Sequence, residues 1–513
     1  MNGMSVGDVL RRAAERAPDR DGLVDVNPPA TRRWTYEELL AESELVARAL
    51  LATFAPGDRI AAFTPNRAEL VVLQFATALA GLTLVALNPL LRRNELRYAL
   101  GQSGAAGILV AEEHRGRRLA EEVAALQPEL PALREIVVPG AGWEALRARA
   151  ADGPRELPRV DPDALAQIQY TSGTTGNAKG VLITHRGMAL TAEAFAGRVH
   201  PTEGGAWVNP MPLFHTAGNV LGTLGATWSC APHVVLAFDP ERTIAATAQE
   251  RAALLSAAPT LLHAILEHPA LPAADLGALE VVITGGSTVE PAFVRRVERG
   301  LGARLSIIFG MTETCGAAMV VDPDDDEEIR STTVGRLLPH TEARISEAGE
   351  LLLRGPRVTR GYHDLPEETA AAIDAEGWLH TGDLASVDER GLFRIEGRLK
   401  DLIKRGGENI APAEVEACLM EHPGVAEAAV VGLPDERWGE IVVAYVRPAS
   451  NPPPDLADLE AHCRERLASF KLPRRWAFVD SMPLTASGKI RRVELRERAA
   501  NDPDALISLS PRG

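Results

Sequence analysis

Short apolar segments alternate with amphipathic helical patterns through most of the chain, and this alternation constrains the fold more than any other feature. Residues 35–51 begin with Thr35 and Glu38, a capping-box pair that starts a helix, and the apolar strand RIAAF follows at 59–63. Similar segments recur at residues 108–113, 279–286 and 305–313. Strands that alternate with helices are typical of a parallel sheet covered by helices, so we expect an α/β fold.

The pattern changes after Gly391. Two short strands are expected at 425–434 and 440–448, with one helix at 455–470, which predicts a small α+β domain. A chain of 513 residues with 46% hydrophobic content also exceeds what one core needs. We therefore predict three parts, namely an N-terminal domain at 1–396, a connection at 397–401 and a C-terminal domain at 402–513.

Composition excludes several classes of protein. The net charge of −16 argues against nucleic acid as the main partner. Four cysteines lie far apart, without the spacing of a zinc site or a disulfide framework, which fits the reducing cytoplasm. The first residues lack the apolar core of a secretory signal. The longest apolar stretch, Val71 to Leu87, is expected to be a buried helix running into a strand, so we predict no membrane span.

Lysine is rare in this sequence. Only five of the 54 basic residues are lysines, and four of the five lie at or after position 400. A compact ammonium can direct one charge into a narrow site, whereas a planar guanidinium prefers a two-point partner. The retained lysines are therefore candidates for contact with phosphate. Residues 471–498 also carry eight basic and three acidic side chains, which suits either a solvated face or a phosphorylated ligand.

A glycine- and hydroxyl-rich segment, YTSGTTGNAKG, occupies residues 170–180. Its backbone N–H groups and hydroxyls can surround phosphate oxygens, because glycine allows close approach of the main chain. It is not a Walker A loop, since glycine rather than serine or threonine follows Lys179. Taken alone, the segment fits a mobile hairpin as well as a phosphate-binding loop.

Six further segments follow in a fixed order. They are PLFHTAGN (212–219), GGSTVEP (285–291), FGMTET (309–314), GWLHTGD (377–383), GRLKDLIKRGGENIAPAEVE (397–416) and PLTASGKIRR (483–492). Together with the glycine-rich segment, this set resembles the superfamily of adenylate-forming enzymes, which includes acyl-CoA synthetases, adenylation domains and luciferases. The resemblance spans residues 35–498. It implies a large N-terminal domain of distorted sheets flanked by helices, and a small mobile C-terminal lid.

The resemblance implies a nucleotide site for ATP and Mg²⁺. Glu313 would hold the metal, and Lys179 would contact the β- and γ-phosphates with the glycine-rich segment. Asp383 and Arg398 would fix the ribose, and Lys489 on the lid would reach the α-phosphate and the substrate carboxylate. The other implied nucleotide-binding residues are Thr171, Ser172, Gly173, Thr174, Thr175, Gly176, Gly285, Gly286, Ser287, Phe309, Gly310, Met311 and Thr312.

A second half-reaction is implied on the lid. The lid would turn about Lys400, withdraw Lys489 and present Gly406 and Gly407, which leave a channel for the pantetheine of coenzyme A. A carrier-protein pantetheine could use the same channel. Because no carrier domain follows Lys489 in this sequence, free CoA is favoured.

The acyl site is expected around His215, which matches the family position that gates the carboxylate or the thiol. The resemblance adds Asn219, Ile308 and Gly310. Gly218, Gly222 and Gly225 lie at helical spacing and can either hollow a pocket wall or allow close helix packing, and the sequence favours neither. Residues 216–238 contain no acidic residue, lysine or arginine, so an uncharged, mainly apolar acid is expected and amino acids are disfavoured.

Several positions depart from the common family pattern. Ala178 replaces proline, Phe309 replaces tyrosine, Ser287 stands where alanine is frequent, and Ile308 occupies a place often held by glycine. The leading interpretation is an ATP-dependent acyl-CoA ligase. Two alternatives stay open: a stand-alone enzyme that loads an acyl or aryl acid onto a carrier protein, and a pseudoenzyme that senses an acyl-nucleotide.

Overall fold

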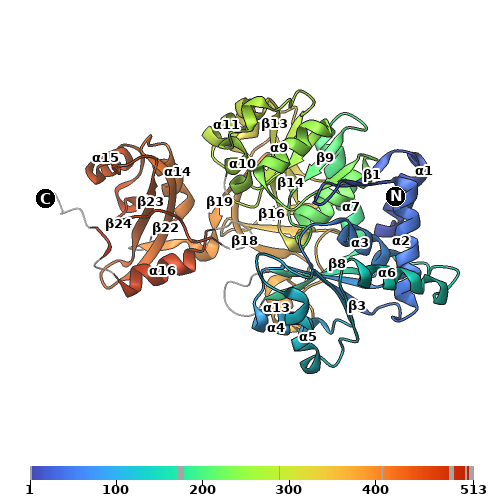
Figure 1. Ribbon diagram of the computed structural model, residues 1–513. Helices are drawn as coiled ribbons and strands as arrows, with labels where there is room; N and C mark the ends of the chain where they lie inside the picture. Colours follow the sequence, from blue (N-terminus) through green and yellow to red (C-terminus); the bar gives the residue numbers. More distant parts are fainter. Residues whose placement is uncertain are drawn as a thin grey trace. The chain divides into compact units, whose positions relative to one another are not determined.

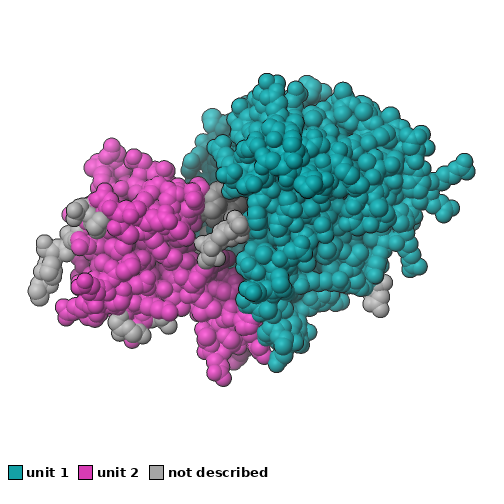
Figure 2. Space-filling view, turned by 90° about the horizontal axis from the view of Figure 1, so that it is seen from below, with its two compact units in different colours: residues 1–343, 353–379 teal, residues 344–352, 380–513 magenta. Residues whose placement is uncertain are grey.

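The computed structural model describes residues 3–171, 178–287, 289–405, 408–484, 490–502 and 505–507. Its contacts divide the chain into two compact units, coloured separately in Figure 2. The first contains residues 1–343 and 353–379, and the second contains residues 344–352 and 380–513. This division falls earlier in the chain than the boundary at 396 expected from the sequence, and the predicted three-part division stays a prediction.

Two sheets form the framework of the first unit among the described residues. One is nine-stranded, in the order β15-β14-β13-β12-β11-β9-β10-β1-β2. Its strands are β1 (Asp21–Asp25), β2 (Arg32–Thr35), β9 (Ala206–Asn209), β10 (His233–Val235), β11 (Ala252–Ser256), β12 (Val281–Gly285), β13 (Arg304–Phe309), β14 (Met319–Val320) and β15 (Arg336–Leu337). The strands from β13 to β1 run parallel, whereas β2, β14 and β15 pair antiparallel at the edges.

The other sheet is six-stranded, in the order β6-β5-β3-β4-β7-β8. Its strands are β3 (Arg59–Phe63), β4 (Thr83–Leu87), β5 (Gly107–Val110), β6 (Glu135–Val137), β7 (Leu165–Thr171) and β8 (Lys179–Thr184). Only β8 is antiparallel to its neighbour. The expected α/β class is therefore confirmed, and antiparallel edge strands are added to the parallel pattern.

Helices cover these sheets. Those of the first unit are α1 (Val6–Arg16), α2 (Tyr36–Leu51), α3 (Ala68–Ala80), α4 (Arg93–Ser103), α5 (Leu119–Leu126), α6 (Ala141–Ala148), α7 (His185–Val199), α8 (Gly225–Trp228), α9 (Pro240–Gln249), α10 (Pro259–Leu266), α11 (Pro291–Leu301), α12 (Glu327–Thr332) and α13 (Pro366–Ala372). Figure 1 shows α9, α10 and α11 beside the nine-stranded sheet.

Helix α3 contributes most of its residues to the largest hydrophobic core cluster among the described residues. All its residues are buried, and it ends at Gly81, whose φ of +68° favours glycine, before the chain enters β4. The expected buried helix followed by a strand is thus confirmed. None of the helices in the described part of the chain is long and apolar enough to span a membrane. The capping box of Thr35 and Glu38 is formed at the start of α2, as its sequence predicts.

The second unit has its own core. A five-stranded sheet is ordered β21-β20-β23-β22, with β24 paired to β23. Its elements are β20 (Ile403–Arg405), β21 (Glu408–Ile410), β22 (Val425–Asp435), β23 (Gly439–Pro448), β24 (Arg475–Phe478), α14 (Pro412–Met420), α15 (Leu456–Arg466) and α16 (Arg492–Asn501). A further sheet is ordered β16 (Glu342–Ile345), β17 (Glu350–Arg354), β18 (Leu379–Val387) and β19 (Phe393–Arg398).

Candidate active site

A hairpin presents the residues on either side of the glycine-rich segment. Strands β7 and β8 pair antiparallel, with Thr171 opposite Lys179, and the Thr171 hydroxyl donates to the Lys179 carbonyl at 3.4 Å. Both side chains are half-buried. The antiparallel pairing therefore brings the two ends of the segment together and fixes Lys179 at the start of β8.

The carboxyl ends of β12 and β13 form the second part of the site. Gly285 lies opposite Ile308, and a Cβ on Gly285 would stand 2.4 Å from the Ile308 carbonyl oxygen. Only glycine fits that approach. Gly286 follows with a φ of +84°, and both Gly286 and Ser287 are exposed. Ligands of open α/β sheets bind at this end of the strands, so these groups are available to a nucleotide.

A tight loop follows Phe309, the last residue of β13. Gly310 has no room for a side chain, because its Cβ would meet the Gly316 carbonyl oxygen at 2.3 Å. Met311 and Thr312 lead into a single 3₁₀ turn, and Cys315 closes it with a φ of +54°. This loop carries the predicted Glu313 on the turn.

Glu313 is a buried carboxylate held at two points. Its side chain is 7% exposed, and its Oε1 accepts a hydrogen bond of 2.9 Å from the Tyr362 hydroxyl. Its carbonyl oxygen accepts another, of 2.7 Å, from the Thr359 backbone N–H. Mg²⁺ is commonly bound by one or two carboxylates together with substrate phosphates, so a single oriented carboxylate fits that ion.

Tyr362 also contacts the predicted phosphate-binding lysine. The Lys179 ammonium nitrogen lies 4.7 Å from the centre of the Tyr362 ring, within the range of a cation–π contact. Burial, and then the Glu313 carboxylate, raise the pKa of the Tyr362 hydroxyl, which therefore stays protonated and able to donate. One side chain thus connects Glu313 with Lys179, although the three residues are far apart in the sequence.

The predicted acyl segment lies against the Glu313 loop. A Cβ on Gly316 would stand 2.9 Å from the Thr216 Cβ, so the residue next to His215 packs on this loop. His215 is half-buried, and its ring lies 4.6 Å from that of Phe214. Residues 217–224 form a π-helix, a geometry that is frequent at functional sites.

The glycines of this segment are packed closely. A Cβ on Gly218 would stand 2.2 Å from the Pro212 carbonyl oxygen, and one on Gly222 would stand 2.1 Å from Asn209 Nδ2. The Asn219 amide donates to the Leu213 carbonyl at 2.9 Å. Close packing therefore accounts for these glycines, and their assignment to an acyl pocket stays a prediction.

Arg357 supports the loop that carries Glu313, and no sequence pattern identified it as a candidate residue. Its side chain is 2% exposed and donates to the Ala317 carbonyl at 2.8 Å. Its own carbonyl accepts from the Cys315 thiol at 3.2 Å. Burial lowers the pKa of this guanidinium to about 10. Arg357, Thr359 and Tyr362 all belong to one stretch of the chain that shows no motif by itself.

The second unit contains the predicted ribose pair. Asp383 on β18 lies directly opposite Arg398 at the end of β19, and Arg398 Nε donates to Asp383 Oδ1 at 2.8 Å. The carboxylate is buried, while the arginine side chain is 47% exposed. Lys400 is exposed in the short turn after β19. Lys471, in the basic window, forms an ion pair with Glu414 at 2.5 Å, so its charge is already balanced.

Eight predicted residues lie outside the described part of the chain. They are Ser172, Gly173, Thr174, Thr175, Gly176, Gly406, Gly407 and Lys489.

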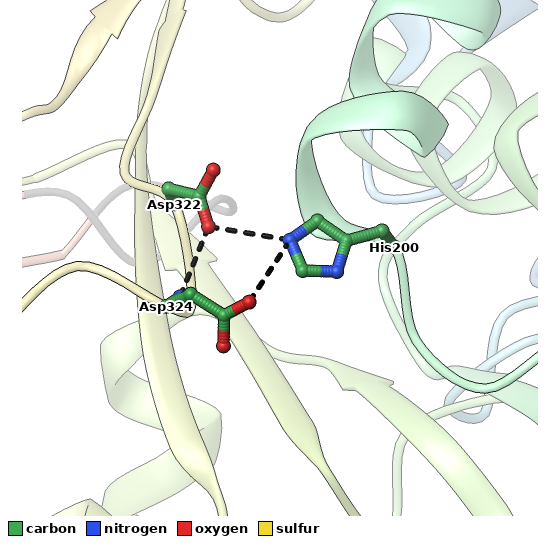
Figure 3. Close-up of side chains that lie close together, drawn as sticks. All are labelled: His200, Asp322 and Asp324. Atoms are coloured by element: carbon green, nitrogen blue, oxygen red, sulfur yellow. Dashed lines mark hydrogen bonds and ion pairs between the residues drawn. The ribbon is translucent and has the colours of Figure 1, made fainter.

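A separate cluster joins His200 with Asp322 and Asp324 on the first unit (Figure 3). The His200 Nε2 atom lies 3.2 Å from Asp322 Oδ1 and 3.7 Å from Asp324 Oδ2. His200 and Asp324 line a cavity of about 610 Å³ at the amino-terminal ends of β12 and β13, the end opposite to Gly285 and Phe309. Arg304 also pairs with Asp324. We therefore interpret the cluster as a set of surface hydrogen bonds and ion pairs.

Two family models match the chain. The AMP-binding enzyme model covers residues 10–363, and the AMP-binding enzyme C-terminal domain model covers residues 414–489. The chain therefore belongs to the family of AMP-binding enzymes, and its predicted membership of the adenylate-forming superfamily is confirmed.

Individual relatives match over nearly the whole chain. The 3-[(3aS,4S,7aS)-7a-methyl-1,5-dioxo-octahydro-1H-inden-4-yl]propanoyl:CoA ligase of Mycobacterium tuberculosis is 38% identical over 515 residues, covering 96% of this chain and 98% of that protein. The mitochondrial medium-chain acyl-CoA ligase ACSF2 of Mus musculus is 33% identical over 541 residues, covering 96% and 87%. The ATP-bound structure of MatB from Rhodopseudomonas palustris superposes with a TM-score of 0.86 at 29% identity, covering 97% and 99%. These matches confirm the predicted fold and enzyme class, an AMP-forming acid–thiol ligase.

Proposed function

We propose that the chain uses ATP to convert a mainly hydrophobic carboxylic acid into an acyl adenylate, and then transfers the acyl group to coenzyme A. The observation that carries this proposal is the arrangement around Tyr362. A cation suited to phosphate oxygens, Lys179, and a carboxylate suited to Mg²⁺, Glu313, both contact that one side chain. They belong to the same unit as the exposed glycine turn after β12.

The first half-reaction joins the acid to AMP. A carboxylate oxygen of the substrate attacks the α-phosphorus of ATP, the bond to the β-phosphate breaks, and pyrophosphate leaves. Negative charge on the phosphoryl oxygens must be stabilised by fixed cations and N–H donors. Lys179 and the glycine-rich segment are proposed to bind the β- and γ-phosphates, and Phe309 with Gly285 and Gly286 to hold the adenine.

A bound Mg²⁺ would neutralise charge on the phosphates, with Glu313 as its protein ligand. Glu313 suits this role because its carboxylate is buried and oriented by the Tyr362 hydroxyl. On the second unit, Asp383 and Arg398 are proposed to fix the ribose hydroxyls. Lys489 is proposed to reach the α-phosphate and the acid carboxylate.

The second half-reaction transfers the acyl group to a thiol. The thiol sulfur attacks the acyl carbon, a thioester forms, and AMP leaves. We propose that the C-terminal part turns about Lys400, so that Gly406 and Gly407 replace Lys489 at the acyl group. Gly397, three residues before Lys400, has a φ of +153°, a backbone conformation that favours glycine, and this supports a hinge in this stretch of the chain.

We further propose that the enzyme works in the cytoplasm.

An apolar acid is favoured because residues 216–238 carry no acidic residue, lysine or arginine that could pair with a charged substrate group. The named substrates of the two relatives, a bicyclic propanoate and medium-chain acids, support the same class. Loading of a carrier protein remains the second candidate, because a pantetheine arm could enter by the same route.

The test is pyrophosphate release measured over a panel of fatty, aryl, alicyclic and polycyclic acids, with and without CoA. An active acid should release pyrophosphate and form acyl-AMP, and CoA should convert the acyl-AMP to a thioester. Lys489→Ala should slow adenylation by about a hundredfold or more, since it removes a charge aimed at the transition state. Arg464→Ala, an exposed cation of α15, is the matched control and should retain the wild-type rate.

Three results would contradict the proposal in different ways. No acyl-AMP from any acid would indicate a nucleotide-binding pseudoenzyme. Wild-type adenylation by Lys489→Ala would remove that residue from the mechanism. Acyl transfer to a pantetheinylated carrier but not to CoA would favour the carrier-loading enzyme.

A further inference from the structure

The segment after Gly355 connects the two charged groups of the nucleotide site. Residues 361–363 run beside β8, because the Leu182 N–H donates to the Gly361 carbonyl at 3.0 Å and the His363 N–H donates to the Gly180 carbonyl at 2.7 Å. Tyr362 is therefore held by backbone hydrogen bonds next to the strand that begins with Lys179. The backbone hydrogen bonds on either side of Tyr362 thus set the position from which its side chain extends to Glu313.

The two functions of the Tyr362 side chain are separable. The hydroxyl donates to Glu313 Oε1 at 2.9 Å, and the ring face receives the Lys179 ammonium at 4.7 Å from its centre. The single hydrogen bond from Tyr362 selects one orientation of the Glu313 carboxylate. The remaining lone pairs on the two carboxylate oxygens can then bind a metal. The ring attracts the ammonium without neutralising its charge, which a carboxylate would do.

We propose that Tyr362 is a positioning residue of this enzyme, whose hydroxyl orients Glu313 toward the metal of the nucleotide and whose ring aligns Lys179 with the phosphates. This inference rests on the proposed function, because it takes Glu313 and Lys179 as the groups that meet metal and phosphate. Tyr362 itself touches neither ligand in the proposal. Outer partners of metal ligands commonly change metal affinity or activity by about 10- to 100-fold when they are removed.

The test measures ATP binding by calorimetry, in EDTA and in excess MgCl₂, so that no acid substrate is required. In the wild type, Mg²⁺ should increase the affinity for ATP. Tyr362→Phe keeps the ring and loses the hydroxyl, so it should reduce this Mg²⁺-dependent gain by about tenfold while affinity in EDTA stays near wild type. Tyr362→Leu loses the ring as well, and should also weaken ATP binding in EDTA by a few-fold.

Tyr36→Phe is the matched control. The Tyr36 hydroxyl is fully buried in the first unit and donates to the Ala231 carbonyl at 2.7 Å, so its removal costs a hydrogen bond far from the nucleotide residues in the chain. The Mg²⁺-dependent gain should not change in this variant. Thermal unfolding of all variants checks that each is folded at the temperature of the titration.

The outcomes separate this inference from the proposed function. A Tyr362→Phe enzyme with the wild-type Mg²⁺-dependent gain would overturn the positioning role, and so would an equal loss in EDTA and in MgCl₂. If Glu313→Gln abolishes the gain while Tyr362→Phe retains it, the inference falls and the proposed metal ligand stands. If the wild type binds no ATP under either condition, the proposed function falls with it.

Discussion

Replacing Gly222 by alanine tests whether the glycines of the π-helix serve packing or an acyl pocket. The new Cβ would stand 2.1 Å from Asn209 Nδ2, so Asn209 must move. That amide donates to the Gly218 carbonyl at 3.0 Å and lies 3.0 Å from His233 Nε2. Because the site is buried, the lost hydrogen bonds and the overpacking should together destabilise the first unit by about 3 kcal/mol.

Thermal unfolding measures this effect. For a unit of this size, 1 kcal/mol should lower the unfolding midpoint by about 1–2 °C, so Gly222→Ala should lower it by about 3–6 °C. Gly197→Ala is the matched control, since Gly197 is exposed on α7 and no described atom lies within 4 Å of its added Cβ. That change should raise the free energy of unfolding by about 0.5–1 kcal/mol, because alanine is the better helix former. A Gly222→Ala enzyme with wild-type stability and a narrowed range of acids would refute the packing explanation.

Two further perturbations test other parts of the structure. Arg398→Met removes the partner that lies 2.8 Å from the buried Asp383 carboxylate. The KM for ATP should therefore rise about tenfold or more, and the second unit should unfold at a lower temperature. Steady-state kinetics measures the first effect and calorimetry the second, and an unchanged KM for ATP would count against a role of this pair in ribose binding. Burial lowers the pKa of His185 to about 4, below its ordinary value near 6.5. The unfolded chain therefore binds this proton more readily than the folded chain does. The stability that neutral His185 contributes above pH 6.5 should be lost as the pH falls toward 4. Between pH 6.5 and pH 4, the unfolding midpoint should drop by less in His185→Gln than in the wild type. If the midpoints of the two proteins fall in parallel with pH, His185 is not the source of the pH dependence.

Local patterns were sufficient to predict the framework of the molecule. The apolar run from Val71 to Leu87 predicts α3 and β4 because full burial leaves no polar face to either element. Thr35 and Glu38 predict the start of α2, since a capping box is a contact between residues three apart. The motif around Glu313 could be recognised because its residues are consecutive.

Partners that are distant in the sequence could not be predicted in the same way. Tyr362 lies 49 residues from Glu313, and nothing in its own neighbourhood specifies a carboxylate partner. The basic window at 471–498 suited either a solvated face or a phosphorylated ligand, and nothing near Lys471 in the sequence indicates its pairing with Glu414, which is 57 residues away. Gly218 and Gly222 fitted two explanations, because a missing side chain has the same sequence signal whether it makes room for a ligand or for the protein itself.

Glu313 is oriented by the folded chain itself, before any ligand binds. Three residues of one segment fix its loop: Arg357 binds the Ala317 carbonyl, Thr359 binds the Glu313 carbonyl, and Tyr362 binds the carboxylate. Because these bonds form when the chain folds, the carboxylate needs little reorganisation when a metal–nucleotide complex arrives. Loosening any of the three should therefore weaken nucleotide binding or catalysis without removing a group that touches the nucleotide. That distinguishes a site oriented by its own fold from one that is assembled only by its ligand.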